Sequence, residues 1–241
     1  MSMQCIIYPM NLLYLLRHGE NVANLTKEFS CRKIDYSLTP RGILQAQQTA
    51  AFFQTQAIDA IYASPLKRAA ETAAIIADTL ALPVTTIEEL REMDVGPLED
   101  AIDLKSAWDF HNSILQSWFE GNPEPRFPQG ENQHDLIRRM RSALQQAVHG
   151  RDGQRILIVG HGGIFRCTIE ALCPTSDLNM VRGVATQNCA YSRLRAGMVN
   201  GELQTELLSW GEHGHISGAA ADFTPGTPDS EEIKGLGSKS G

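Results

Sequence analysis

Two short apolar runs in this sequence each lead directly into a histidine flanked by glycine. An Arg-His-Gly run at residues 17–19 follows the apolar residues 12–16, and a Gly-His-Gly-Gly run at residues 160–163 follows the mostly apolar residues 155–159. Apolar runs of this length predict buried strands. Arginine and histidine side chains at the end of a buried strand are costly unless an anion meets them. Because open α/β sheets bind ligands at the carboxyl ends of their strands, the two runs predict one anion-binding crevice if their strands are neighbours.

The second histidine also precedes a predicted helix over residues 164–172. The backbone N–H groups at the start of such a helix, here including that of Gly162, favour a bound anion. The alternative is that each strand simply reaches the surface and ends in polar residues. Since two strands end in the same way, a shared site containing His18 and His161 is the better interpretation.

Strand-like and helix-like segments alternate along the chain and must position these residues. Helical periodicity and capping pairs such as Thr39-Pro40 indicate the helices, and short apolar runs indicate the strands. The predicted strands cover residues 12–16, 58–62, 83–87, 155–159, 189–194 and 203–208, and the predicted helices cover residues 40–54, 66–80, 102–120, 131–149 and 164–172. This alternation predicts an α/β fold, a three-layer α/β/α sandwich around a mostly parallel sheet. The polar residues 22–37 are predicted to form an irregular loop that faces the substrate.

Length and composition are typical of one globular domain. The chain has 241 residues and a net charge of −7. We expect a single domain over residues 1–216 and a disordered or loosely packed tail over residues 217–241, where Gly, Ala, Ser, Pro and Thr accumulate. The negative charge argues against nucleic acid or an anionic membrane as a partner, and no apolar run approaches the ~20 residues of a membrane span. Association with a second copy, as a homo-oligomer, is left open.

The cysteines and the remaining histidines give no sign of a metal site. The five cysteines are Cys5, Cys31, Cys167, Cys173 and Cys189. Their number is odd and no two form a CxxC pair, so we expect reduced thiols in a cytoplasmic protein. The pair His213 and His215 is far short of a complete set of metal ligands.

Several further segments, together with the two histidine runs, form an ordered set. The set comprises Arg17-His18-Gly19-Glu20 followed by Asn24, Ser64-Pro65-Leu66-Lys67-Arg68, Leu90-Arg91-Glu92 followed by Gly96, Phe127-Pro128-Gln129-Gly130-Glu131, Val159-Gly160-His161 and Gln187-Asn188-Cys189-Ala190. In order and spacing, this set resembles the signature segments of the histidine phosphatase (phosphoglycerate mutase-like) superfamily, in its phosphatase branch. The resemblance covers about residues 12–208, which is most of the chain.

The resemblance implies a phosphate site built around one nucleophile. His18 would attack phosphorus through a neutral ring nitrogen and become a phosphohistidine. Arg17 and Arg68 would bind the phosphoryl oxygens with planar, charged guanidinium groups. Asn24 would add a neutral hydrogen bond, and His161 would lie beside the nucleophile and donate to a phosphoryl oxygen. A surface position for Arg68, on an alanine-rich helix, is the alternative interpretation of that residue.

The resemblance assigns the proton donor to Glu92. Its carboxyl group would protonate the leaving alkoxide and then take a proton from the attacking water. Three nearby carboxylates, Glu88, Glu89 and Asp94, leave the choice open, because an acidic run of this kind is usually a solvated surface.

The activity implied is metal-independent hydrolysis of a small phosphorylated metabolite. No metal and no cofactor is expected, because two arginines and two histidines supply the positive field. A cofactor-dependent, phosphoglycerate-type mutase is the alternative. Those mutases carry a long insertion with extra basic residues where this chain has residues 96–128, and Thr-Gly where it has Ser30-Cys31. An inactive phosphate-binding scaffold is a third interpretation, which the intact site residues disfavour.

The identity of the substrate depends on the segments around the phosphate site. Residues 26–36 and the predicted helix 102–120 are expected to shape the pocket mouth. Lys27, Arg32 and Lys33 would either attract a second anionic group of the substrate or be ordinary surface charges. The aromatic residues of the helix are expected in the core or in the pocket wall.

Overall fold

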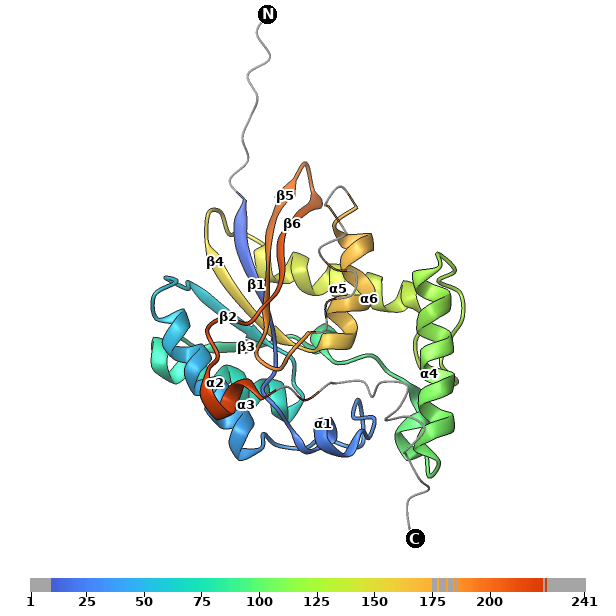
Figure 1. The fold of residues 1–241 in the computed structure, drawn as a ribbon. Helices are drawn as coiled ribbons and strands as arrows, with labels where there is room; N and C mark the ends of the chain where they lie inside the picture. The colour runs from blue at the N-terminus through green and yellow to red at the C-terminus, as the bar shows by residue number, and fades with distance from the viewer. Residues whose placement is uncertain are drawn as a thin grey trace, which may run out of the picture.

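A six-stranded mixed sheet forms the centre of the molecule (Figure 1). The computed structural model describes residues 10–174, 177, 181, 184, 186–222 and 224. The strands lie in the order β3-β2-β4-β1-β5-β6. Their bounds are β1 Asn11–Arg17, β2 Ala60–Ala63, β3 Val84–Thr86, β4 Arg155–Gly160, β5 Tyr191–Val199 and β6 Glu202–Glu212. The first four strands in the order are mutually parallel, whereas β5 and β6 are antiparallel additions at one side.

The predicted neighbours β1 and β4 pair directly at the centre of the sheet. Their parallel register places Leu16 beside Val159 and Arg17 beside Gly160. Each histidine follows the last residue of its strand, so both leave the sheet at the same edge and the same level. The predicted α/β fold with its mostly parallel sheet is therefore confirmed.

Helices cover both faces of the sheet. The helices are α1 Val22–Thr26, α2 Pro40–Phe53, α3 Lys67–Leu80, α4 Leu104–Phe119, α5 Gln133–Val148 and α6 Gly162–Leu172. Alternate side chains of the central strands point to opposite faces. Tyr14 and Leu16 belong to the apolar cluster of α2 and α3, whereas Leu13 and Leu15 belong to that of α5 and α6. The arrangement gives the three layers expected.

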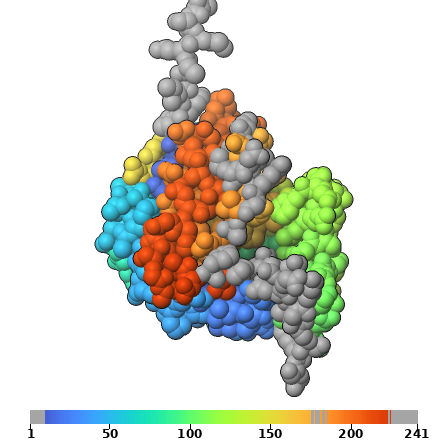
Figure 2. Space-filling view, viewed as in Figure 1, coloured from blue at the N-terminus to red at the C-terminus, as the bar shows by residue number. Residues whose placement is uncertain are grey.

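Helix α4 lies apart from the two covering layers. Its apolar side, which includes Trp108 and Trp118, packs in a third cluster with Phe29, Phe127 and Leu136. Figures 1 and 2 show α4 as a lobe at one side of the molecule, beyond α5 and α6. This helix therefore contributes little to the sheet core and is placed to form the wall of a pocket at the sheet edge.

The segment predicted as an irregular loop, residues 22–37, begins instead with the short helix α1. Asn21 caps this helix with its side chain, and Asn24 hydrogen-bonds back to the Asn21 backbone N–H at 3.1 Å. This reciprocal capping closes the first turn without an apolar stripe. The loop prediction rested on the polar, irregular composition of the segment, and it was wrong for residues 22–26.

The chain packs against the body beyond the predicted domain boundary at residue 217. Ala220 is fully buried, and its carbonyl accepts a hydrogen bond of 3.0 Å from Gln45 of α2. The Ser217 N–H donates to Gln48 at 2.8 Å. Figure 1 shows this segment lying along α2. The packed part of the chain thus reaches Asp222, while residues 223 and 225–241 of the predicted tail lie outside the described residues. No helix among the described residues is long and apolar enough to cross a membrane.

Helix α2 packs backbone against backbone on the loop that follows the first histidine. A Cβ added at Gly42 would lie 2.0 Å from the carbonyl oxygen of Glu20. The Glu20 carboxylate is held in turn by Thr39 at 2.7 Å and by Arg41. The start of α2 therefore fixes the loop beside His18, and this contact requires glycine at position 42.

We expect Gly42→Ala to lower the free energy of unfolding by about 1–3 kcal/mol, because the added methyl group forces two backbone segments apart. Urea denaturation of the variant and the wild type measures this loss. Gly214→Ala is the matched control, since a Cβ at that position meets nothing within 4 Å. Equal stability of Gly42→Ala and Gly214→Ala would show that the contact is not tight.

Candidate active site

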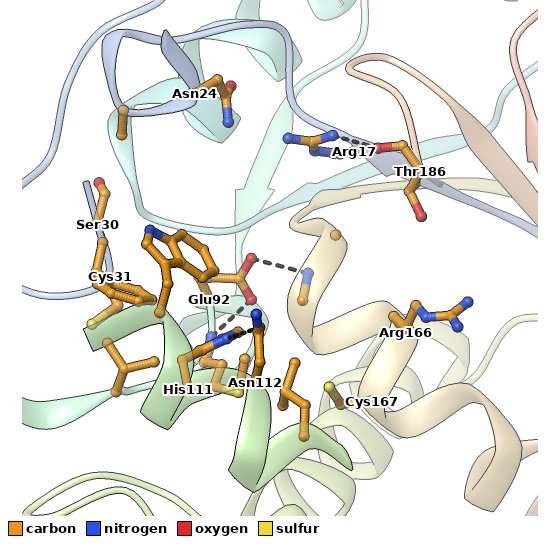
Figure 3. A pocket seen from close by; sticks show the side chains of 18 of the residues that line it. Arg17, Asn24, Ser30, Cys31, Glu92, His111, Asn112, Arg166, Cys167 and Thr186 are labelled. Carbon is orange, nitrogen blue, oxygen red and sulfur yellow. Dashed lines mark hydrogen bonds between the residues drawn. The ribbon is translucent and has the colours of Figure 1, made fainter. Parts of the chain in front are cut away.

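Six of the seven predicted site residues line one cavity of about 980 Å³ at the carboxyl edge of the sheet (Figure 3). They are Arg17, His18, Asn24, Arg68, Glu92 and Gly162. His161 lies behind this surface, fully buried, with its ring centroid 5.2 Å from that of His18. The fold thus brings together residues that are up to 145 positions apart in the sequence, from position 17 to position 162.

The His18 ring is held in one neutral tautomer. Its Nδ1 lies 2.7 Å from the carbonyl oxygen of Gly19, which can only accept, so Nδ1 carries the proton. Its Nε2 accepts a hydrogen bond of 3.1 Å from Nε of Arg68. This nitrogen therefore carries no proton, and its lone pair is directed toward Arg68. Burial, with the charges of Arg68 and Arg17, holds the pKa of His18 well below its usual value. The imidazole is consequently uncharged at neutral pH.

Arg68 is buried and is fixed by the loop before α2. Its Nη1 and Nη2 donate to the hydroxyl and the carbonyl of Ser30 at 3.0 and 2.8 Å. Burial lowers the pKa of this guanidinium. Arg68 lies at the start of α3 and turns toward the cavity, so the alternative of a surface position does not hold. Ser30, one of the two residues that differ from the mutase pattern, here holds the arginine.

Arg17 lies along the start of α6. Its side chain passes Gly162 so closely that a Cβ there would come within 3.3 Å of Arg17 Cδ. One of its terminal nitrogens donates to the backbone carbonyl of Thr186. Burial lowers the pKa of Arg17 to about 10, which still leaves it charged at neutral pH. A phosphoryl group in the cavity would meet two guanidinium groups and the first N–H groups of a helix.

His161 directly precedes α6, and its ring lies against Ser64. Its Nε2 is 2.8 Å from the Ser64 hydroxyl, and its Nδ1 is buried without a hydrogen-bond partner. Burial and the neighbouring charges, led by Arg68, hold its pKa well below the usual value. A buried, unpartnered ring nitrogen beside the nucleophile is the position from which a histidine could contact a bound phosphoryl group.

The Asn24 side chain is oriented by two neighbours. Its Oδ1 accepts hydrogen bonds of 3.1 Å from the Asn21 N–H and from Nδ2 of Asn188. With the oxygen engaged in this way, the amide nitrogen is the group that can donate toward the cavity. Asn188 also donates to the carbonyl of His18 at 3.1 Å, so it ties the nucleophile to Asn24.

Glu92 places its carboxylate at the N-terminus of α6. Its two oxygens accept hydrogen bonds from the N–H groups of Gly163 at 3.1 Å and Ile164 at 2.8 Å. Figure 3 shows the carboxylate pointing into the cavity. Among the four carboxylates considered from the sequence, Glu92 is the one that lines this cavity, whereas Glu88 bonds to Arg91 and Asp94 pairs with Arg32.

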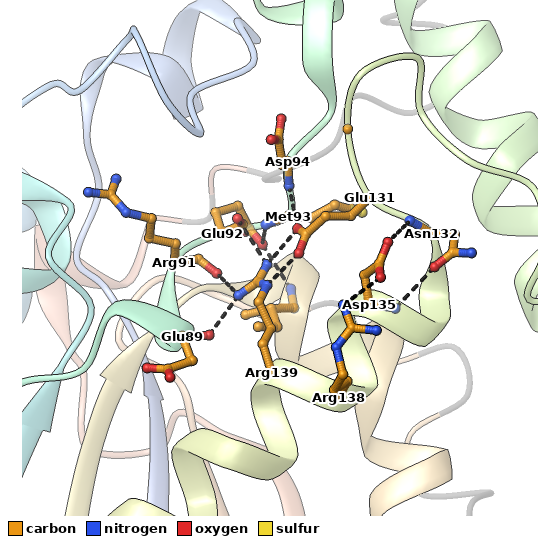
Figure 4. Close-up of polar contacts among 12 residues, drawn as sticks. Glu89, Arg91, Glu92, Met93, Asp94, Glu131, Asn132, Asp135, Arg138 and Arg139 are labelled. Atoms are coloured by element: carbon orange, nitrogen blue, oxygen red, sulfur yellow. Dashed lines mark hydrogen bonds and ion pairs between the residues drawn. The ribbon is translucent and has the colours of Figure 1, made fainter.

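An ion pair behind Glu92 holds its segment in place (Figure 4). The Arg139 guanidinium donates to the carbonyls of Glu89 at 2.7 Å, Arg91 at 2.6 Å and Glu92 at 3.2 Å. Glu131 pairs with the same guanidinium at 2.7 Å. The segment of residues 127–131 therefore supplies the carboxylate that fixes Arg139. Arg139 in turn fixes the backbone that carries Glu92.

A second buried carboxylate, Glu99, anchors the loop that holds Arg68. It accepts hydrogen bonds between 2.7 and 3.1 Å from four successive backbone N–H groups. The donors are Cys31, Arg32, Lys33 and Ile34. Burial opposes ionisation here, but the four donors hold the pKa of Glu99 below its usual value. This role was not predicted, because Glu99 lies within an acidic run whose composition is typical of a solvated surface.

The three cations expected near the pocket mouth do not line the cavity. Arg32 pairs with Asp94 at 3.2 Å and Lys33 with Asp100 at 2.5 Å. The backbone carbonyl of Lys27 accepts a hydrogen bond from Trp108. The interpretation that these residues attract a second anionic group of the substrate therefore finds no support in the cavity lining.

Comparison with known proteins matches residues 13–206 to the family described as the histidine phosphatase superfamily (branch 1). The chain is 32% identical over 182 residues to the probable phosphoglycerate mutase GpmB of Proteus mirabilis, a match that covers 76% of this chain and 83% of that protein. GpmB of Yersinia enterocolitica is 33% identical with the same coverage.

Solved structures share the fold. Bacillus stearothermophilus YhfR has a TM-score of 0.69 and 26% identity, covering 86% of this chain and all of that one. Phosphoserine phosphatase from Entamoeba histolytica, solved with 3-phosphoglyceric acid, also has a TM-score of 0.69, with 24% identity and coverage of 86% and 100%. The second likeness is evidence for the fold alone.

The buried histidines predict a loss of stability as the pH falls below 6.5. Five described histidines have a pKa lowered by burial: His18, His111, His161, His213 and His215. The unfolded chain takes up protons near pH 6.5, whereas the folded chain does not. The unfolded state therefore binds more protons and is stabilised relative to the folded state in acid. Each such histidine contributes up to about 1.4 kcal/mol per pH unit.

We therefore expect the free energy of unfolding to fall by at least about 2 kcal/mol between pH 7 and pH 5, as measured by urea denaturation. His111→Phe should reduce this slope, because His111 has a pKa of about 4 and packs among aromatic rings that can accept a phenyl group. A free energy of unfolding that stays constant or rises over this range would contradict the neutral, buried state of these rings.

We expect Glu99→Gln to weaken phosphate binding through Ser30 and Arg68. An amide offers one acceptor oxygen and sets an NH2 group against the backbone donors, so the loop loses charge-assisted hydrogen bonds. KM for a phosphomonoester and Kd for inorganic phosphate should rise about tenfold, with a smaller change in kcat. Asp100→Asn is the control, since this neighbour is exposed and its carboxylate pairs with the Lys33 side chain. Unchanged KM and Kd in Glu99→Gln would remove the anchoring role.

Proposed function

Because the chain belongs to the histidine phosphatase superfamily (branch 1), we propose that it hydrolyses phosphomonoesters without a metal through a phosphohistidine at His18. The observation that carries this proposal is the state of the His18 ring. Nδ1 is held as a donor by Gly19, and Nε2 presents its lone pair beside Arg68. A neutral imidazole with a fixed tautomer is the form that can act as a nucleophile.

In the first step, Nε2 of His18 forms a bond to phosphorus and the ester P–O bond breaks. Arg17, Arg68, the Gly162 N–H and the amide of Asn24 meet the phosphoryl oxygens, where the charge is concentrated. Glu92, which must be protonated when the substrate binds, gives its proton to the leaving alkoxide. These fixed donors supply the positive field, so the proposed step uses no metal and no cofactor.

In the second step, water attacks the phosphohistidine and the P–N bond breaks. Glu92, now ionised, takes a proton from the water, and inorganic phosphate leaves with His18 again neutral. The backbone N–H groups of Gly163 and Ile164 support the ionised carboxylate between the two steps. His161 lies beside the ring throughout and would donate to a phosphoryl oxygen.

A phosphoglycerate-type mutase is the second candidate, and the name of the GpmB relatives favours it. Both reactions share the first step and differ in the acceptor, which is water for the phosphatase and a second hydroxyl for the mutase. We favour the phosphatase because the chain from Gly96 to Pro128 is short, and because the cations near the mouth do not line the cavity.

We further propose that the substrate is a small phosphorylated metabolite and that the enzyme works in the cytoplasm. The described cysteines Cys31, Cys167, Cys173 and Cys189 are buried free thiols. Burial raises their pKa, to about 12 for Cys31 and Cys189 and about 11 for Cys173, which makes them inert core residues that suit a reducing compartment.

Rapid quenching with a ³²P-labelled phosphomonoester should trap an acid-labile, alkali-stable label on the wild-type chain. His18→Ala should abolish the label and reduce kcat at least about 10³-fold, because the covalent route is lost. His149→Ala is the control, an exposed histidine at the end of α5.

Full activity in His18→Ala would overturn the mechanism. In a separate assay, the wild-type protein is given 3-phosphoglycerate with its bisphosphorylated primer. Sustained interconversion faster than release of inorganic phosphate would favour the mutase over the phosphatase.

A further inference from the structure

The cavity extends well beyond the phosphate site, and aromatic and aliphatic side chains form most of this extension. Phe29 approaches from the loop after α1, and Trp108, Leu115 and Phe119 approach from α4. Met93 follows directly after the proposed proton donor. A volume of about 980 Å³ is at the upper end of the range for small-molecule sites. A phosphate ester of a three-carbon alcohol would leave much of it filled with water.

The deepest part of this wall is a cluster of rings with little capacity for hydrogen bonds. Phe29 and Trp108 lie with ring centroids 4.3 Å apart, and His111 lies 4.8 Å from Trp108. The indole N–H of Trp108 is engaged by the carbonyl of Lys27 at 2.8 Å. Burial lowers the pKa of His111 to about 4, so its ring is neutral. These rings can therefore offer mainly apolar contact to a ligand.

The described lining residues offer little positive charge for a second anionic group. Arg17 and Arg68 belong to the phosphate site, which leaves Arg166 as the further cation among the described lining residues. Its guanidinium donates to the Val181 carbonyl and lies 5.4 Å from the centre of the Phe119 ring. Figure 3 shows Arg166 directed away from Glu92.

The acidic residues around the extension also disfavour a second anionic group on the substrate. The carboxylates Glu28 and Glu120 line the cavity together with Glu92. A carboxylate on the substrate would meet repulsion from these groups and would lose its hydration against apolar walls.

We propose that the substrate is a phosphomonoester whose alcohol carries a large uncharged apolar group, with an aromatic ring as its best fit, and no carboxylate. This inference rests on the proposed phosphatase activity and adds the class of its leaving group. The phosphate would be bound at the sheet edge, and the apolar group would lie between α4 and the Phe29 loop. Phe119, at the end of α4, is then a residue that determines specificity.

The test compares two esters that differ only in the apolar group. Propyl phosphate and 3-phenylpropyl phosphate are both esters of primary alcohols, so the chemical step has nearly the same intrinsic difficulty for each. We expect kcat/KM to be at least about tenfold higher for the phenyl compound, the value expected for burial of one ring. 3-Phosphoglycerate should be the poorest of the three substrates.

Two variants of α4 locate the preference within the cavity. Phe119→Ala should lower the ratio of kcat/KM between the phenyl and propyl esters at least about threefold, since part of the wall is removed. Phe110→Ala is the matched control, because Phe110 is 40% exposed against 44% for Phe119, lies on the same helix and does not line the cavity. It should keep the wild-type ratio.

The outcomes separate the two proposals. Hydrolysis of both esters with equal kcat/KM, or a preference for 3-phosphoglycerate, would overturn the apolar specificity and leave the phosphatase activity standing. Absence of hydrolysis for all three compounds, with no label on His18, would overturn the phosphatase itself. A ratio lowered equally by Phe119→Ala and Phe110→Ala would place the preference outside the cavity wall.

Discussion

The parallel pairing of β1 with β4 is the constraint on which the site depends. It places Arg17 beside Gly160, so His18 and His161 leave the sheet together. Two histidines and two arginines then share a buried space, where each is costly to charge. The lowered pKa of both histidines is the direct result, because the rings lose their protons while the arginines remain charged. Burial, together with the same arginine charges that would bind phosphate, therefore keeps the His18 ring neutral.

Such a concentration of cations must be held rigidly, and one buried and one partly buried carboxylate outside the phosphoryl cavity provide this support. Glu99 binds the loop that orients Arg68 through Ser30, and Glu131 fixes Arg139 behind Glu92. Neither carboxylate needs to touch the substrate in the proposed reaction. Each satisfies backbone or guanidinium donors that would otherwise be buried without partners, which explains why charged residues occupy positions with so little access to water.

The sequence predicted the parts of this arrangement that depend on local pattern. The ends of β1 and β4, the alternation of strands and helices, and the order of the signature segments all followed from runs of residue types. Glu99 and the carbonyl of Thr186 could not be found in this way. Each contact involves backbone groups, the N–H groups bound by Glu99 and the Thr186 carbonyl bound by Arg17. Because every residue carries such groups, only the folded chain reveals these contacts. Helix α1 was missed for a related reason, since capping by Asn21 and Asn24 defines it rather than apolar periodicity.

The cavity has a cationic region at the sheet edge and an apolar, acidic extension beside α4. This division explains how an acidic protein could bind an anionic ligand. The chain carries a net charge of −7, yet the proposed phosphate site would need positive charge only over the short range in which buried guanidinium groups act. Beyond that range, the carboxylates on the cavity wall favour neutral groups. A ligand with one phosphate and an uncharged apolar body suits both regions, whereas a ligand with a second negative charge suits only the first. The lobe built on α4, which contributes little to the sheet core, can therefore set the choice of alcohol without altering the chemistry at the sheet edge.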